Sequence, residues 1–410
     1  MSQQGPIIVV STVGRPTFAA ALDEAQIFPI IDAGWADASR AVAQLQPAAV
    51  LVAMSDPVET DFAALAKQIT AAEPYLPLIA IDPVTSLPEN AIPFSQSGGH
   101  FDRLIRRLRA ALRVRTLHTT VLRRLRDEPE ARTSLPDSDP VPDATVLLIG
   151  RGAAYPSLSV SLGERMGVVG ALSIEAAAKH LNVRDIDGIV LGEGFSPRVV
   201  DAFLTVLAED TRFRNLPVVV TSDDLAPTYD LPNLEIISGD PERIAANASP
   251  LFRQHALEAH LSRTLRSIDA GGLLDPRTGL LMPAAFNREF ATAVYQTLSN
   301  GGGLSVARFA FDPAQARAQI DGARILSRLM RRMDFGSVQD DGSIVVVFPE
   351  TDLRNAHMIA RRLSSVMRHT SHGKRDARAE PMVTLATMLP SDSARSLLAR
   401  LTEEARRAAS

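Results

Sequence analysis

The sequence predicts a multidomain α/β protein in which two doubly wound domains precede a third domain built around a β-hairpin. Its 410 residues exceed what one hydrophobic core usually serves. Two similar passages recur at an offset near 140 residues. In both passages short apolar runs alternate with helical patterns, which is typical of parallel sheets covered by helices.

The composition is that of a globular protein: 46% hydrophobic residues, 22% charged residues and a net charge of -4. There is no cysteine, which excludes disulfides, thiol catalysis and cysteine metal sites and favours a reducing compartment. No basic excess points to nucleic acid. No apolar stretch approaches the ~20 residues of a membrane span, and the first residues lack a signal-peptide pattern. We therefore expect a cytoplasmic protein with no membrane span and no nucleic-acid partner.

The first predicted domain covers residues 1–126. Its apolar runs are bounded by Gly, Pro or Asp, as buried parallel strands are. It closes with an arginine-rich helix in which apolar residues recur at steps of four or five: Leu104, Leu108, Leu112, Leu117, Val121 and Leu125. This stripe predicts a core or a dimer seam. The arginines predict a solvated face, with an anionic partner as the alternative.

Residues 127–143 are rich in Pro, Ser and Asp, which predicts an exposed linker. The second predicted domain, 144–266, repeats the first: "TVLLIG" answers to "PIIVVS" and "NLPVVV" to "YLPLIA". The third predicted domain covers 267–410. Almost all basic residues are arginine, since the lysines are only Lys67, Lys179 and Lys374. Any site that needs a lysine must use one of these three.

The order of strands and helices in the first two domains resembles the CheY-like receiver domain of two-component response regulators. The resemblance implies an acidic pair that holds Mg²⁺ after the first strand, a phosphoacceptor Asp after the third, and a hydroxyl residue and a Lys after the next two. The positions of the acidic pair are occupied by Ser11, Thr12, Gly150 and Arg151. These residues offer no carboxylate to a metal ion.

The phosphoacceptor positions align with Ala53 and Gly192. The hydroxyl position holds Thr221 in the second domain but Asp82 in the first, and none of the lysines follows a fifth strand. We therefore expect no phosphorylation. The displaced carboxylates Asp56 and Glu193 are the candidates that would restore it.

The segment "DPRTGLLMPAAF" (275–286) is similar to the opening motif DxLTGLxNRxxF of GGDEF domains. The positions that agree are Asp275, Thr278, Gly279, Leu280 and Phe286, and those that depart are Arg277, Met282 and Pro283. A first central strand at 301–312, a hairpin and helix at 338–363 and a strand at 382–390 follow in the family's order. The whole chain resembles receiver–receiver–GGDEF response regulators of the PleD-like diguanylate cyclase family. The resemblance implies a central, mainly antiparallel sheet in the third domain.

Active members of that family join two GTP molecules into cyclic di-GMP, with metal ions that neutralise triphosphate charge. The GGDEF turn aligns with Asp340, Asp341, Gly342, Ser343 and Ile344. The two carboxylates would repel phosphate, and Gly342 replaces the metal ligand. The first-strand Asp falls on Ala310, with Asp312 as its only substitute. We expect no catalytic residues, no catalytic cofactor and no Mg²⁺; Asp341-Gly342 equally suits a two-residue hairpin turn.

The family's inhibitory product site, RxxD five residues before the turn, falls on Arg331 and Asp334. Arginine can donate to guanine O6 and N7, and aspartate can accept from guanine N1 and N2. The resemblance implies that Arg362, with Arg361 beside it, helps to bind the cyclic di-GMP product. The alternative is structural, because an Arg at a helix C-terminus favours the dipole and can pair with Asp334 for stability alone.

The sequence thus predicts a catalytically inactive GGDEF-family signalling protein that acts as a cyclic di-GMP receptor and scaffold. Two alternatives remain open: a ligand-free adaptor that only binds proteins, and an active diguanylate cyclase response regulator that uses displaced residues. In each case we expect a homodimer with protein partners in bacterial signalling.

Overall fold

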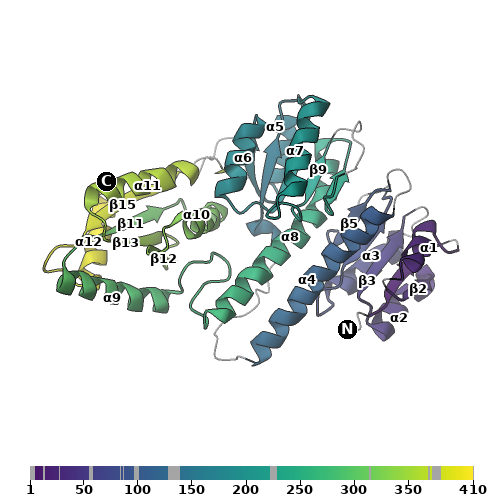
Figure 1. The fold of residues 1–410 in the computed structure, drawn as a ribbon, viewed down its shortest axis with the longest axis horizontal. Helices are drawn as coiled ribbons and strands as arrows, with labels where there is room; N and C mark the ends of the chain where they lie inside the picture. Colours follow the sequence, from purple (N-terminus) through teal and green to yellow (C-terminus); the bar gives the residue numbers. More distant parts are fainter. Residues whose placement is uncertain are drawn as a thin grey trace.

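Three β-sheets with their helices follow one another along the molecule (Figure 1). The computed structural model describes residues 5–409 apart from short gaps, which are 13, 27, 55–58, 84, 86, 97–100, 128–138, 222–228, 314, 368–369 and 372–379. No helix in the described part of the chain is long and apolar enough to cross a membrane.

The first sheet has five parallel strands in the order β2-β1-β3-β4-β5. Its strands are β1 (Ile7–Val10), β2 (Ile30–Ala33), β3 (Ala49–Ala53), β4 (Leu78–Ile81) and β5 (Ala91–Phe94). Its helices are α1 (Thr17–Glu24), α2 (Trp35–Leu45), α3 (Glu59–Thr70) and α4 (Asp102–Asp127). Central strands such as the "AVLVA" of β3 are buried throughout because helices cover both faces.

The second sheet repeats this order, as the internal repeat predicts. Its parallel strands are β6 (Thr145–Ile149), β7 (Gly167–Ala171), β8 (Gly188–Leu191), β9 (Val218–Val220) and β10 (Leu234–Ile236). Its helices are η2 (Val141–Asp143), α5 (Tyr155–Gly163), α6 (Ile174–Val183), α7 (Pro197–Glu209) and α8 (Pro241–Asp269). A sixth strand, β14 (Thr370–Ser371), comes from the last part of the chain and pairs antiparallel with β7. The sequence did not predict this shared strand.

The third sheet is antiparallel, in the order β12-β13-β11-β15, as expected. Its strands are β11 (Leu304–Ala310), β12 (Phe335–Val338), β13 (Ile344–Pro349) and β15 (Met382–Thr387). Its helices are α9 (Pro283–Asn300), α10 (Ala316–Leu329), α11 (Leu353–Met367) and α12 (Ala394–Ala409). Apolar residues of α10 and α11 pack on one face of the sheet, and those of α9 and α12 on the other.

The predicted linker, 127–143, is described only at its ends, which belong to α4 and to Asp139–Asp143 with the short helix η2. The predicted boundary at 266/267 falls inside α8, which continues to Asp269.

Helices α4 and α8 lie side by side and join the first two domains (Figure 1). Leu104, Leu108 and Leu112 belong to the core under the first sheets, and Val121 packs with Leu261 and neighbouring residues of α8. The apolar stripe of α4 is therefore a core within one chain.

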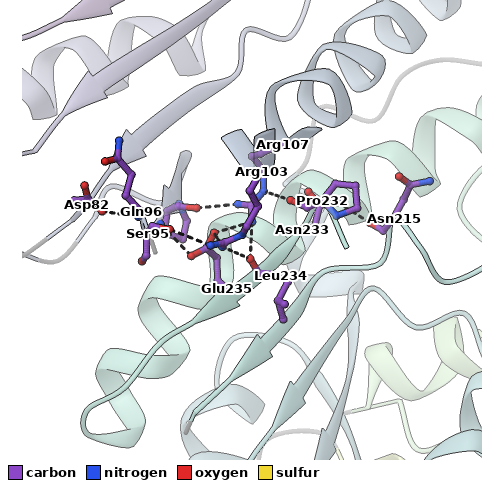
Figure 2. Close-up of polar contacts among 11 residues, drawn as sticks. Asp82, Ser95, Gln96, Arg103, Arg107, Asn215, Pro232, Asn233, Leu234 and Glu235 are labelled. Atoms are coloured by element: carbon purple, nitrogen blue, oxygen red, sulfur yellow. Dashed lines mark hydrogen bonds and ion pairs between the residues drawn. The ribbon is translucent and has the colours of Figure 1, made fainter. Parts of the chain in front are cut away.

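Several arginines of α4 bind the second domain, so the prediction of a solvated face is wrong for them. Arg103 and Arg107 are buried and both donate to Oε1 of Glu235 at 2.8 Å (Figure 2). Arg107 also donates to the Pro93 and Pro232 carbonyls at 2.8 and 2.6 Å. Burial lowers the pKa of Arg107 to about 10, although the Glu235 charge opposes this shift.

The Glu235 triad, meaning Glu235 with Arg103 and Arg107, has a measurable effect on stability. We expect Glu235→Gln to lower the free energy of unfolding by about 3 kcal/mol, because two buried guanidiniums lose their countercharge. The measurement is the midpoint of urea unfolding. Glu258→Gln, which breaks only the part-exposed Arg113 pair, is the matched control with an expected loss of about 0–1 kcal/mol. Equal losses in the two variants would contradict the importance of burial.

Stability should also depend on pH through His260, which is buried in α8 with its Nε2 3.2 Å from Thr264 Oγ1. Burial, helped by Arg263, lowers the pKa of His260 from 6.5 to about 4. The unfolded chain therefore takes up this proton first, and stability falls as the pH drops from 6.5 towards 4, by about 3 kcal/mol in all. His260→Gln should flatten that part of a plot of unfolding free energy against pH. The exposed His357→Gln should leave the plot unchanged.

Candidate functional site

Arg331 and Asp334 meet directly after α10, as the sequence predicts. The Asp334 carboxylate accepts hydrogen bonds from the Arg331 backbone N–H at 3.0 Å and from Nε and Nη2 at 3.1 and 2.9 Å. Arg331 Nη2 also donates to Thr351 Oγ1 at 2.8 Å. The Asp334 side chain is only 1% exposed, whereas that of Arg331 is 39% exposed.

This arrangement is a closed ion pair whose outer edge faces solvent. Both Asp334 oxygens are engaged by Arg331, so a ligand that hydrogen-bonds to this carboxylate must first displace the guanidinium. No described residue accepts a hydrogen bond from Arg331 Nη1. The pair therefore presents one free donor group without rearrangement.

A groove of about 530 Å³ lies against this pair. Its walls come from the start of α9, from the loop before it and from residues 330–336. Besides Arg331, it is lined by Arg288 and Arg332, with Glu289 as the opposing charge. Sequence reasoning missed Arg288, because no spacing rule connects an arginine at the start of α9 with a turn more than forty positions later.

The structure does not bring Arg361 to this groove. Arg361 lines a second groove of about 530 Å³ between α11 and β15, together with Glu380. Arg362 is exposed on α11, nine residues beyond the helix start and so about 13 Å along its axis from the end near Arg331. Within the described residues, no hydrogen bond or ion pair links Arg361 or Arg362 to Arg331 or Asp334.

The turn that aligns with GGDEF is a tight three-residue loop rather than the expected two-residue turn. Gln339 N–H donates to the Ser343 carbonyl at 2.7 Å, and Gly342, with φ of +76°, takes the left-handed position. This combination is common in three-residue hairpins. A side chain at Gly342 would lie 2.8 Å from Gln319 of α10, so the turn is also closely covered.

The carboxylate of Asp341 is held by three hydrogen bonds, although its side chain is 57% exposed. It accepts from Ser343 N–H and Oγ at 3.0 and 2.6 Å and from Arg308 Nη2 at 2.7 Å. Partial burial raises the pKa of Asp341, but the bonds from Ser343 and Arg308 outweigh it and lower the pKa overall. Arg308 is a charged residue within the otherwise apolar run of β11, and this signal in the sequence could have indicated it as the partner of Asp341.

Ala310 ends β11 beside this turn, since Phe309 pairs with Ile344. Asp312 follows two residues later, and its carbonyl accepts from Gln315 N–H at 2.8 Å. In the described ranges, no group of three or more His, Cys, Asp or Glu side chains is placed to hold a metal ion.

The positions aligned above with the receiver phosphorylation site lie at the carboxyl ends of the parallel strands in the first two sheets. Ala53 ends β3, and Thr12 Oγ1 accepts from Trp35 Nε1 at 3.1 Å. In the second sheet a hollow of about 50 Å³ is lined by Gly150, Gly192, Glu193 and Thr221, so Glu193 does reach this edge. Asp56 and Lys374 fall outside the described residues.

Comparisons with known proteins were made by sequence and by structure. No protein-family model matches the chain, and no curated protein matches it. The coiled coil and GGDEF domain of DgcB from Caulobacter crescentus, solved in complex with c-di-GMP, is 15% identical with a TM-score of 0.31, covering 35% of this chain and 83% of that one. A sensory box/GGDEF family protein from C. crescentus CB15 is 18% identical with a TM-score of 0.29, covering 32% and 94%. The FimX GGDEF domain from Pseudomonas aeruginosa is 16% identical with a TM-score of 0.29, covering 32% and 90%.

Helix α10 connects the Arg331 groove to the second domain. Four polar residues at steps of four, three and four form one face of it: Arg317, Asp321, Arg324 and Arg328. Each contacts a residue outside the third sheet; Asp321, for example, accepts from the buried Arg184 at 2.7 Å. Arg328 donates to the Arg184 carbonyl at 2.8 Å and lies three residues before Arg331. Arg331 is thus close in the chain to a hydrogen bond between the third and second domains, and a shift of Arg331 can affect that bond.

Proposed function

We propose that this chain is a GGDEF-family signalling protein without cyclase activity that binds cyclic di-GMP at Arg331 and Asp334. The observation that carries this function is the meeting of these two residues at the edge of a groove with two further arginines, Arg288 and Arg332. Two receiver-like domains without phosphorylation complete the assignment.

The chemistry of the groove suits a guanine dinucleotide. Arg331 can turn its paired donors to guanine O6 and N7, and the released Asp334 can accept from guanine N1 and N2. Both Arg331 and Asp334 thereby replace their mutual hydrogen bonds with hydrogen bonds to guanine. Arg288 and Arg332 can neutralise the two phosphates, and guanidinium planes can stack on the bases. A volume of about 530 Å³ is within the usual range for small-molecule sites.

The turn at 340–343 favours the absence of catalysis. Two consecutive aspartates stand where backbone would approach a triphosphate, and Arg308 is already engaged by Asp341. The Gln319 side chain lies close to Gly342. A nucleotide would have to displace these contacts and overcome the repulsion of Asp340 and Asp341.

The dinucleotide would act by changing how the third domain sits on the second. Opening the Arg331–Asp334 pair shifts the C-terminal end of α10, where Arg328 holds Arg184 and Asp185. A ligand biases such docking only if it binds the two arrangements with different affinity. Homodimerisation and docking of bacterial signalling proteins on the receiver-like domains belong to the same proposal.

The second candidate function is a ligand-free adaptor. One observation favours it: Arg331 already binds both Asp334 and Thr351, which stabilises the pair without any ligand.

Calorimetric titration with cyclic di-GMP separates these two functions. We expect micromolar or tighter binding to the unchanged chain, and a loss of about 100-fold in Arg331→Ala because a paired donor to guanine contributes up to about 3 kcal/mol. Asp334→Asn should weaken binding as well. Arg395→Ala, an exposed arginine on α12, is the matched control that keeps full affinity. Absence of binding to folded protein would favour the adaptor. Arg361→Ala and Arg362→Ala should have little effect if the groove described above is the site.

A second experiment addresses the enzyme. Incubation with GTP and Mg²⁺ should yield no cyclic di-GMP by chromatography, because the turn repels the triphosphate. Product that disappears in Asp312→Ala would establish a working cyclase with a displaced metal ligand.

A further inference from the structure

A cavity of about 310 Å³ lies between the first two domains, far along the chain from the Arg331 groove. The first domain contributes the end of α3 with the loop after it, including Tyr75, and also Asn90. The second contributes Pro140 and one face of α8, from Pro250 to Leu257. Apolar walls with a few polar groups, at a boundary between domains, are typical of small-molecule sites.

Gln254 is the polar group that needs explanation. It lies on α8, is 6% exposed and lines the cavity, yet no described residue forms a hydrogen bond with its side chain. A carboxamide has two donor hydrogens and one acceptor oxygen, and the Gln254 amide, which is accessible from the cavity, has no partner for them among the described residues. A ligand in the cavity would supply those partners.

Tyr75 and Arg253 define what such a ligand can be. The Tyr75 hydroxyl has no hydrogen-bond partner among the described residues, and burial raises its pKa, so it remains a donor. The Arg253 charge is already balanced, because Nε donates to Asp139 at 3.0 Å and Nη2 lies 3.5 Å from Glu89. The cavity therefore offers hydrogen bonds without net charge.

We propose that this cavity binds a small, uncharged, planar molecule with a carboxamide-like edge, which pairs donor-to-acceptor with the Gln254 amide. Its flat body lies between Tyr75 and the apolar side chains of α8. Because both domains line the cavity, the bound molecule contacts both and strengthens their association.

Benzamide is the probe for this site, titrated into the full chain and followed by ligand-observed NMR. We expect a Kd below about 1 mM, which lies within the range that ligands of this size can reach. Gln254→Leu should weaken binding at least tenfold. Gln296→Leu, at an exposed position on α9, should leave it unchanged. Ethylbenzene, which has no polar edge, and benzoate, which is charged, should both bind at least tenfold more weakly than benzamide.

The stability of Gln254→Leu is measured as well, so that a loss of benzamide binding can be distinguished from unfolding. Gln254→Leu removes an amide that forms no hydrogen bond with the described residues, so its unfolding temperature should equal or exceed that of the unchanged chain. Absence of benzamide binding to the unchanged chain, or equal affinity in Gln254→Leu, would show that the cavity holds only water and overturn the assignment. Ala72→Leu, which narrows the cavity, should also reduce binding.

Discussion

The carboxylate of Glu235 lies between two buried guanidiniums, and the arrangement of the first two domains depends on it. Arg103 and Arg107 come from α4, Glu235 from β10, and other donor groups reach backbone carbonyls of both domains (Figure 2). Arg103 Nε is buried without a partner in the described part of the chain. Removing such charges from water is costly, and the countercharge of Glu235 with the carbonyl acceptors offsets that cost. The triad therefore fixes α4 against β10 of the second domain.

The joint between the second and third domains is built on the same principle. Side chains on the polar face of α10 form hydrogen bonds with carbonyl groups of the second domain and with the buried Arg184. Arginine suits this role because its planar fork can satisfy several carbonyl oxygens at once. The scarcity of lysine in the sequence is thus reflected in how the domains are joined.

Much of the fold could be predicted from the sequence, because burial on both faces leaves a local pattern. The apolar runs of β3 and β13 and the hairpin follow from such patterns, whereas the position of Arg331 follows from the resemblance to GGDEF domains. The partners of the α4 arginines in the second domain could not be predicted, since these acceptors lie more than a hundred residues away. The closure of Arg331 on Asp334 and the place of Arg361 in another groove depend on three-dimensional packing in the same way.

Strand β14 makes the second domain depend on a segment far downstream. Thr370 and Ser371 cover the outer edge of β7, which would otherwise present unpaired N–H and C=O groups. Exposed edges of this kind pair readily with other chains. A protein shortened anywhere between α8 and residue 370 would consequently carry an open sheet margin, prone to self-association even though its own parallel strands were all retained.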